Sequence, residues 1–421
     1  MRKMMDSGLD IVGQMPNEWN FVRLRYLCDI TTGDSDTQDA EPDGEYPFYV
    51  RSPIVERSTK FTFNGEGILM AGDGAGAGRV FHHAFGKYAV HQRVYRLYNF
   101  KVNSNFLFYY ISNLFPSVMD KGSAQSTVPS VRLPMLLNFE VCFPPLAEQQ
   151  KIADFLDEKC GEIDSIRSDV QREIEILNDY KKSVITEAVT KGLNPKAKLK
   201  DSGIEWIGKI PEEWNVKKLK YVFAEGVFGL KIGPFGSALK DCVMANGEYK
   251  VYNQAHIISN DFSLSRHFIS EESYNRLYSY RVLPDDILFS MMGTIGKCQI
   301  MPRGYPEGIM DSHLLKARLK DFVLPKFFQY VYDKDNCAII YAQLEQYAKG
   351  TIMNGLNSSI VKKLIMPVPP LSEQKAIADY LDEKCSEIDA TIADKQKQLE
   401  TLDEYKKSLI FEYVTGKKEI I

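Results

Sequence analysis

Two stretches of the chain share one helical pattern of apolar and polar positions. In residues 371–421, apolar residues recur at heptad-like spacing, at Ile388, Ile392, Leu399, Leu402, Leu409 and Tyr413. In residues 146–192 the same stripe falls on Ile163, Val170, Ile174, Leu177, Val184 and Ala188. Lysines interrupt both stripes, at Lys181, Lys395 and Lys406. The pattern predicts two amphipathic helices, each on the order of 65 Å long at about 1.5 Å per residue.

Local signals set the ends of both predicted helices. Each helix follows a proline pair, Pro144-Pro145 or Pro369-Pro370, and proline is tolerated at a helix start but not inside it. Ser372 is a good cap for the second helix, whereas Ala147 is a poorer one for the first. The helices are expected to end near Gly192 and Gly416.

The regions before these helices have a different pattern. They are rich in Tyr, Phe, Gly and β-branched residues, with strand-like runs at 46–50, 94–97 and 286–289 separated by glycine-bearing turns. A short helix is expected in each region, around 106–114 and around 326–333. Each region therefore predicts an α/β domain with a mixed or antiparallel sheet.

The chain also contains two internal repeats. Residues 6–26 recur as 201–221 with ten of 21 positions identical, including Trp19 and Trp214. Residues 143–190 recur as 368–415 with 28 of 48 positions identical. The intervening regions 27–142 and 222–367 show only faint similarity. The plan predicts a pseudo-twofold molecule whose long helices pack antiparallel; the alternative is an old gene duplication without functional symmetry.

Charge and cysteine content narrow the class of protein. The formal charge is −4, but residues 146–192 and 371–421 together carry −8, so the remainder carries +4 and could face phosphates. Seven scattered cysteines without a CxxC pair indicate reduced thiols in a cytoplasmic protein. No apolar run is long enough for a membrane span, and no apolar stretch behind Met1-Arg2-Lys3 suggests a secretion signal.

No catalytic motif emerges from the residues. The run Gly293–Cys298 misses the phosphate-binding loop spacing, and Gly72–Arg79 does not keep G-x-G-x-x-G in register. The latter is better explained as a flexible or tight DNA-facing loop than as a cofactor site. The proline pairs lack the residues of an adenine methyltransferase motif, and neither a nuclease carboxylate–lysine set nor a metal-ligand histidine spacing is present. The Asp-Glu-Lys triplets at 157–159 and 382–384 are interpreted as solvated helix faces.

The stretch P-P-L-[AS]-E-Q-x-x-I-A-D-[FY]-L-D, at Pro144–Asp157 and Pro369–Asp382, resembles the specificity subunits of type I restriction–modification systems. The Trp-containing repeats and the loops 229–240 and 350–356 are also similar to that family. The resemblance implies an α+β protein in which two target-recognition domains are joined by an antiparallel coiled coil. It implies domains at 1–142 (with the segment 1–26) and 193–367 (with 201–221), and spacer helices at 143–192 and 368–421.

The resemblance further implies partners rather than catalysis. The chain would bind double-stranded DNA, two methyltransferase subunits and motor–nuclease (restriction) subunits, and no membrane. S-adenosylmethionine, ATP and Mg²⁺ would belong to those partner subunits, with no cofactor in this chain.

Candidate DNA-contacting residues are polar side chains in loops of the two divergent regions, because base edges are read by such groups. The first region contributes Arg51, Arg57, Arg79, His82, Gln92, Arg93, Gln125 and Ser126. The second contributes Lys231, Ser237, Lys240, Asn253, Gln254, His256, Lys349, Thr351 and Asn354.

Two alternatives remain open. The chain could serve a type IIB-like system whose partner is a fused nuclease–methyltransferase, or it could be a two-headed scaffold whose divergent domains bind proteins.

Overall fold

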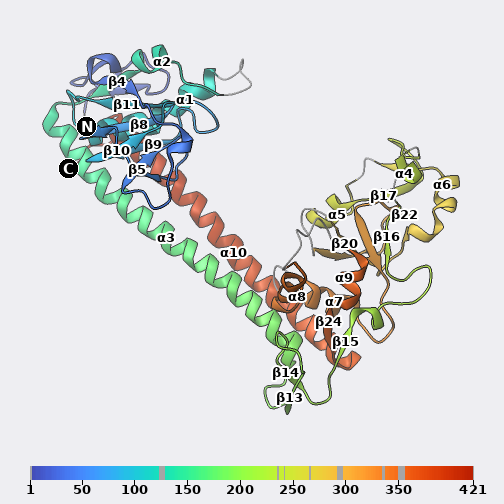
Figure 1. The fold of residues 1–421 in the computed structure, drawn as a ribbon. Coiled ribbons are helices and arrows are strands. Elements are labelled where there is room, and N and C mark those ends of the chain that lie inside the picture. The colour runs from blue at the N-terminus through green and yellow to red at the C-terminus, as the bar shows by residue number, and fades with distance from the viewer. Residues whose placement is uncertain are drawn as a thin grey trace. The chain divides into compact units, whose positions relative to one another are not determined.

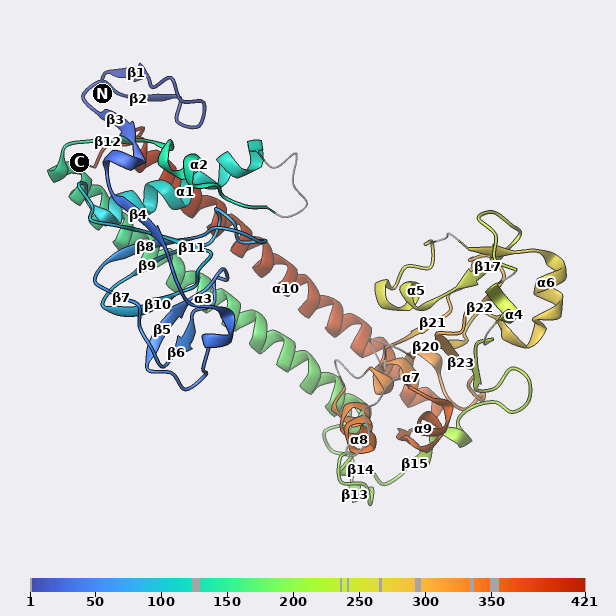
Figure 2. The same cartoon turned by 45° about the horizontal axis from the view of Figure 1, so that its top comes forward.

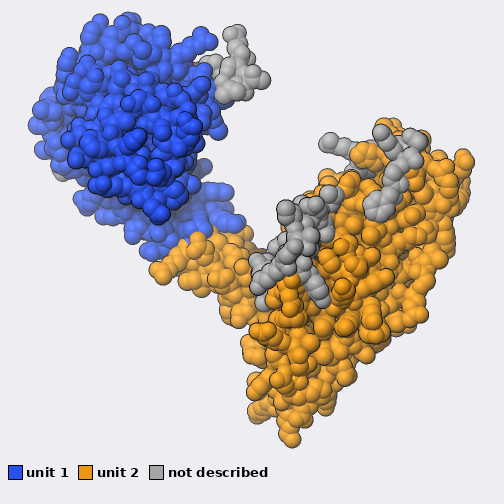
Figure 3. Space-filling view, in the orientation of Figure 1, with its two compact units in different colours: residues 1–171, 396–421 blue, residues 172–395 orange. Residues whose placement is uncertain are grey.

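The computed structural model describes residues 2–122, 129–234, 237–240, 242–264, 267–291, 297–333, 337–348 and 356–420. The chain divides into two compact units (Figure 3). Unit 1 comprises residues 1–171 and 396–421, and unit 2 comprises residues 172–395. Each unit therefore contains one α/β domain together with part of each long helix.

The two long helices predicted from the repeats are present (Figure 1). Helix α3 spans Leu146–Lys191 and helix α10 spans Leu371–Val414, each starting directly after its proline pair. The glycine that follows each helix has the left-handed conformation of a C-terminal cap, with φ of 74° at Gly192 and 70° at Gly416. The proline pairs and terminal glycines therefore marked the helix ends, but the prediction of Ser372 as a cap was wrong, because α10 begins at Leu371 and Ser372 lies inside it.

In each unit the two helices pack antiparallel, as predicted, and the lysines in their apolar stripes account for part of the contact. In unit 1, Lys406 Nζ on α10 lies 2.6 Å from Asp164 Oδ1 on α3. In unit 2, Lys181 Nζ on α3 lies 2.7 Å from Asp389 Oδ1 on α10. The two pairs occupy equivalent positions of the 225-residue repeat. An interrupting lysine thus pairs with the opposite helix instead of weakening the seam.

The α/β domain of unit 1 is built on two four-stranded sheets with orders β4-β11-β8-β9 and β6-β5-β10-β7, which Figure 2 separates. Strand β5 runs parallel to β10, and the other pairs in these sheets are antiparallel. Two-stranded sheets β1-β2 and β3-β12 complete the domain. The bounds are β1 Met4–Asp6, β2 Gln14–Pro16, β3 Asn20–Arg23, β4 Asp29–Thr32, β5 Tyr46–Tyr49, β6 Glu56–Ser58, β7 Phe63–Asn64, β8 Gly67–Ala71, β9 Phe81–Ala84, β10 Lys87–Val90, β11 Val94–Tyr98, α1 Ser104–Gly122, α2 Leu133–Leu137 and β12 Glu140–Phe143.

Unit 2 repeats this topology strand for strand. Its four-stranded sheets have orders β16-β23-β20-β21 and β18-β17-β22-β19, with β17 parallel to β22, and its two-stranded sheets are β13-β14 and β15-β24. The bounds are β13 Leu199–Asp201, β14 Lys209–Pro211, β15 Asn215–Lys218, β16 Lys231–Ile232, α4 Ser237–Lys240, β17 Tyr249–Tyr252, α5 Gln254–Ser259, β18 Phe268–Ile269, α6 Glu271–Arg276, β19 Arg281–Val282, β20 Ile287–Ser290, β21 Cys298–Ile300, β22 Gly308–Met310, β23 Leu314–Ala317, α7 Pro325–Tyr332, α8 Ala338–Ala348, α9 Ser358–Lys363 and β24 Ile365–Val368. Regions with faint sequence similarity therefore share one fold.

One glycine in each unit allows the first strand of one sheet to pass close to the other sheet. Gly33 follows β4, and a Cβ there would overlap the backbone carbonyl of Val90. Gly233 follows β16, and a Cβ there would overlap the carbonyl of Asp311. Both backbone N–H groups donate to β11 or β23, to Val94 O at 3.2 Å and to Leu314 O at 2.9 Å. These equivalent crossovers bring the ends of the two sheets together.

The repeated element P-P-L-x-E-Q joins each domain to the start of its long helix through hydrogen bonds of its glutamine. In unit 1, buried Gln149 accepts from Asn103 N–H at 2.8 Å and donates to Pro144 O at 2.7 Å. In unit 2, buried Gln374 accepts from Leu324 N–H at 2.8 Å and donates to two backbone carbonyls. Because Asn103 and Leu324 immediately precede α1 and α7, the glutamine fixes that helix against the long one.

The Asp-Glu-Lys triplets lie on exposed helix faces, as interpreted, but their aspartates also accept hydrogen bonds from the domains. Tyr109 on α1 donates to Asp157 at 2.8 Å, and Tyr330 on α7 donates to Asp382 at 2.6 Å. Burial raises the pKa of the Tyr330 hydroxyl above its usual value, and the hydrogen bond to Asp382 raises it further. These aspartates are further ties between domain and helix.

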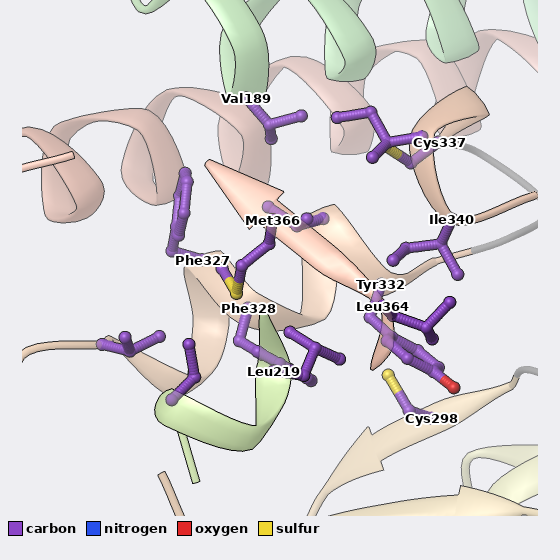
Figure 4. Close-up of a cluster of buried hydrophobic side chains, with 14 of the residues drawn as sticks. Val189, Leu219, Cys298, Phe327, Phe328, Tyr332, Cys337, Ile340, Leu364 and Met366 are labelled. Atoms are coloured by element: carbon purple, nitrogen blue, oxygen red, sulfur yellow. The ribbon is translucent and has the colours of Figure 1, made fainter. Parts of the chain in front are cut away.

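The core of unit 2 joins its domain to the end of α3 (Figure 4). Val189 of α3 lies in one cluster with Phe327, Phe328 and Tyr332 of α7 and with Met366 of β24. All five side chains are at most 1% exposed. The long helices are therefore part of the domain cores as well as of the coiled coil.

Candidate nucleic-acid interface

A cleft opens in unit 1 beside the crossover of the two sheets. It has a volume of about 670 Å³ and is bordered by the loop after β5 and by the glycine run after β8. The lining residues are Thr37, Val50, Arg51, Ser52, Pro53, Glu56, Asp73, Gly74, Ala75, Gly76 and Val80. Of the sequence candidates, Arg51 lines this cleft directly.

The glycine run is a tight, packed loop. Gly74 and Gly78 have φ of 74° and 64°, and a Cβ at Gly78 would clash with Met119 on α1. A Cβ at Gly76 would overlap the backbone carbonyl of Arg51. The glycines therefore serve close approach between the loop, α1 and the segment that follows β5.

Two exposed arginines converge on one carboxylate at the cleft. Arg51 Nη1 lies 3.0 Å from Asp73 Oδ1, and Arg93 Nη1 lies 2.8 Å from Asp73 Oδ2. Burial by itself would raise the pKa of the Asp73 carboxyl, but the hydrogen bonds from both arginines bring that pKa below its usual value. Each guanidinium still has donors left, because it carries five N–H groups.

Behind the arginines, a buried histidine holds the crossover loop. The backbone N–H of Arg93 donates to His91 Nδ1 at 3.0 Å, so the other ring nitrogen carries the proton. That Nε2 lies 3.3 Å from Thr37 Oγ1. Burial lowers the pKa of His91, which keeps the ring neutral. Gln92, also predicted as a DNA contact, donates to Asp36 at 3.1 Å on the same rim.

The remaining candidates of unit 1 have varied surroundings. The Arg57 guanidinium donates to the backbone carbonyls of Gly44 and Glu45 at 2.9 and 2.7 Å, which ties a turn. Arg79 pairs with Asp120 on α1. His82 Nε2 lies 3.1 Å from Ser52 O at the cleft. Gln125 and Ser126 lie outside the described residues.

The equivalent positions in unit 2 follow from the strand pairing. His91 N–H donates to Tyr49 O, and Asp311 N–H donates to Tyr252 O. Arg51 and Arg93, each two residues further on, therefore correspond to Gln254 and His313. Gln254 is the first residue of α5 and His313 lies in the turn before β23, and only Gln254 was among the predicted contacts. Gln254 Oε1 is buried and has no hydrogen-bond partner among the described residues.

Two neighbours of Gln254 support its loop. The Asn253 side chain accepts from Ala255 N–H at 3.0 Å and caps α5. His256 is 3% exposed, accepts from Asn253 N–H at 3.1 Å and lies 2.5 Å from Leu264 O. His256 therefore has no free ring nitrogen with which to contact a base in this structure.

The other candidates of unit 2 lie partly outside the description. Lys231 Nζ lies 4.3 Å from the centroid of the Tyr280 ring. The backbone of Ser237 and Lys240 forms α4, whereas their side chains are outside the described part of the chain. Lys349, Thr351 and Asn354 are outside it altogether. The first described residue after them is Leu356, whose N–H donates to Met291 O at 2.8 Å. The equivalent hydrogen bond in unit 1 runs from Val131 N–H to Gly72 O at 2.7 Å.

Sequence reasoning missed two residues that organise this site, Asp73 and His91. Asp73 stood inside a glycine run directly after a fully buried strand, where loops often carry function, and that position was the available signal. Across the described residues, no group of three or more His, Cys, Asp or Glu side chains could hold a metal ion. Within the same residues, no helix is both long and apolar enough to cross a membrane.

Two copies of one α/β domain, each with a polar rim at its sheet crossover and each joined to both long helices, place the chain in the class of duplicated two-domain α/β proteins. The model of the Type I restriction modification DNA specificity domain matches residues 16–175 and 211–401. Since these ranges include most of the sequence, the chain belongs to this family.

Individual relatives agree with this assignment. The chain is 26% identical over 427 residues to the type I restriction enzyme MjaVIII specificity subunit of Methanocaldococcus jannaschii, covering 96% of this chain and 94% of the relative. It is also 26% identical over 310 residues to the putative MjaX specificity subunit of the same organism, covering 72% and 64%. A solved structure from work on complex assembly and conformational transition of the type I R-M system has a TM-score of 0.66 at 15% identity, covering 96% and 99%. This last similarity concerns the fold.

Proposed function

We propose that the chain is the DNA-specificity subunit of a type I restriction–modification complex and has no catalytic activity of its own. Each α/β domain reads one half of a bipartite DNA site, and the paired helices set the unread gap between the halves. The observation that carries this proposal is the identical strand order of two domains whose rim side chains differ. A shared scaffold with different polar rims is what reading two different half-sites requires.

Methyl transfer and ATP hydrolysis are assigned to partner subunits. Two adenine methyltransferase subunits dock on the helices and bring S-adenosylmethionine, and restriction subunits bring ATP and Mg²⁺. Tyr180 on α3 and Tyr405 on α10 occupy equivalent positions of the repeat, with exposed fractions of 48% and 56%. Exposed aromatic side chains at equivalent positions suit the docking of two identical partners.

The first experiment is modification mapping by single-molecule sequencing in methylation-free cells. The cells express this chain with the methyltransferase encoded beside it, and control cells lack the chain. We expect a new bipartite motif with methylated adenine in both halves, present only with the chain. No new modification, with the partner shown to be folded and bound, would favour a protein-binding scaffold instead.

The helices can be tested as a ruler. Four residues inserted in one helix, about one turn, add about 5.4 Å, against about 3.4 Å per base pair, so the gap should grow by one or two base pairs. Exchange of residues 27–142 for those of another subunit should change one half-site alone. An active insertion variant with an unchanged gap would contradict the ruler.

Two further controls separate the alternatives. A partner reading frame that encodes a fused nuclease–methyltransferase would assign the chain to a type IIB-like system. Methyl transfer by the isolated chain with labelled cofactor, which we expect to be absent, would contradict the non-catalytic role.

A further inference from the structure

The arrangement of Arg51, Asp73 and Arg93 is more specific than a basic patch. Both arginines are substantially exposed, with side-chain fractions of 42% and 64%, while Asp73 is 15% exposed beneath them. Arg93 is held twice, by Asp73 at its guanidinium and by His91 at its backbone N–H. Two long, flexible side chains are thus held in one geometry before any ligand binds.

The charge of this trio argues for base edges rather than phosphates. Two arginines and one aspartate carry a net charge of +1, so Asp73 cancels half of the attraction that the arginines would offer to a phosphate. A base edge is neutral, and its recognition depends on the direction of the N–H groups more than on net charge. Arginine paired with guanine O6 and N7 is the commonest specific contact of this kind. Fixed orientation with reduced net charge fits such a contact better than it fits a phosphate anchor.

The glycine run lets the trio reach a groove edge. Gly76 packs against the backbone of Arg51, where any Cβ would overlap it, and Gly74 N–H donates to Pro129 O at 3.0 Å. The loop is therefore drawn back against the domain, with Arg51 and Asp73 lining the cleft and the exposed Arg93 bound to the same Asp73.

We propose that Asp73 is a positioning residue that directs Arg51 and Arg93 at guanine in the half-site read by unit 1. This inference rests on the proposed function and deepens it, because it names a base and the side chains that choose it. The half-site read by unit 1 then contains at least one G·C pair whose identity depends on these three residues.

The first test maps modification motifs for Arg51→Lys, Arg93→Lys and Asp73→Asn, each expressed with the partner methyltransferase. Lysine keeps the charge but loses the planar fork, so a phosphate contact tolerates it and a guanine contact does not. We expect the half-site of unit 1 to relax at a G·C pair in at least one arginine variant, and at the same pair in Asp73→Asn. The other half-site, read by unit 2 in the same molecule, reports that the complex is folded and should stay unchanged.

The second test uses purified complex and duplex oligonucleotides of the mapped motif. Replacing each guanine of the half-site in turn by 7-deazaguanine removes its N7 acceptor. A complete bidentate pair is worth roughly 5- to 150-fold in binding, so at the contacted position we expect loss of N7 alone to weaken binding towards the lower end of that range. The matching arginine variant should lose less affinity on that modified DNA than on unmodified DNA, because one of the two acceptors is already absent.

Several results would overturn the inference and leave the proposed function intact. One is a half-site of unit 1 without a G·C pair, and another is an unchanged motif in all three variants. A third is an Arg51→Ala or Arg93→Ala variant that binds all sequences equally weakly with a salt slope reduced by about one, the behaviour of a lost phosphate contact. Absence of any bipartite motif with the unaltered chain would instead refute the proposed function.

Discussion

The two units have the same topology but stabilise a buried cation in different ways. The central strands β11 and β23 carry Arg96 and Lys316 at equivalent positions, each two residues after the crossover contact. Arg96 donates to Tyr88 Oη at 2.8 Å and to Glu66 O at 3.0 Å, and it lies over the Tyr98 ring at 4.5 Å.

Lys316 instead has a carboxylate nearby. Its Nζ lies 3.9 Å from Asp286 Oδ2 and donates to the carbonyl of Arg281, and both Lys316 and Asp286 are at most 1% exposed. Burial lowers the pKa of Lys316 to about 8 and raises the pKa of Asp286. Polar partners can thus be exchanged while strand order is kept. The same freedom applies to the rim residues, since Arg51 and Arg93 of unit 1 correspond to Gln254 and His313 of unit 2.

The crossover glycines are the shared feature with the largest expected effect. Gly33→Ala and Gly233→Ala each place a methyl group on a backbone carbonyl that cannot move without disrupting a strand. We expect each to destabilise its own unit by about 3 kcal/mol or more, the upper range of overpacking. Hydrogen–deuterium exchange by mass spectrometry should show the loss in unit 1 for the first variant and in unit 2 for the second. Equal protection in both units would contradict the equivalence of the crossovers.

The two glutamines that join each domain to its long helix should contribute unequally to the free energy of unfolding. Gln374→Ala removes three hydrogen bonds, and Gln149→Ala removes two. A buried polar group left without a partner costs roughly 1–3 kcal/mol. We therefore expect the free energy of unfolding to fall by about 2–3 kcal/mol in Gln374→Ala and by somewhat less in Gln149→Ala. Exchange rates at the starts of α7 and α1 measure these losses locally. The exposed neighbour Lys375→Ala is the control, and a loss of the same size there would contradict the assignment.

The sequence predicted the helices and the repeats because their signals are local. Proline pairs, terminal glycines and apolar stripes lie within the segments they define, and the runs at 46–50 and 286–289 became β5 and β20 for the same reason. The common topology of the two domains was not predictable in this way, because the parallel pairing of β5 with β10 joins residues about 40 positions apart.

The candidate site shows the same limit. Residue type was enough to select Arg51 and Arg93, but not to reveal that Asp73 holds both. Residue type also favoured His256 as a DNA contact, whereas packing buries it. The assignment of the remaining candidates as DNA contacts stays a prediction, and so do the bounds of the four predicted domains and spacer helices.

The buried cations predict different responses to pH. Because the pKa of Lys316 is lower in the folded chain than in the unfolded chain, the unfolded state binds more protons between about pH 8 and pH 10.5, and stability from this residue rises with pH. The free energy of unfolding of the unaltered chain, measured relative to that of Lys316→Met, should therefore rise by on the order of 1–2 kcal/mol between pH 7.5 and 9.5. Urea denaturation at both pH values measures it. Arg96→Met is the matched variant in unit 1, and an equal shift in both variants would contradict the contrast.

The smallest predicted effect concerns the one interior position where the two long helices differ in backbone freedom. Gly161 in α3 corresponds to Ser386 in α10, and a Cβ at Gly161 would meet no atom within 4 Å. Gly161→Ala should stabilise the chain by about 0.5–1 kcal/mol, because glycine loses the most conformational freedom in a helix. Ser386→Ala should gain less, since serine already restricts the unfolded backbone. Urea midpoints of the two variants make the comparison. If Gly161→Ala were destabilising, the space around this residue would have to be occupied within the isolated chain. If it stabilised the chain but weakened methyltransferase binding, that space would belong to the docked partner.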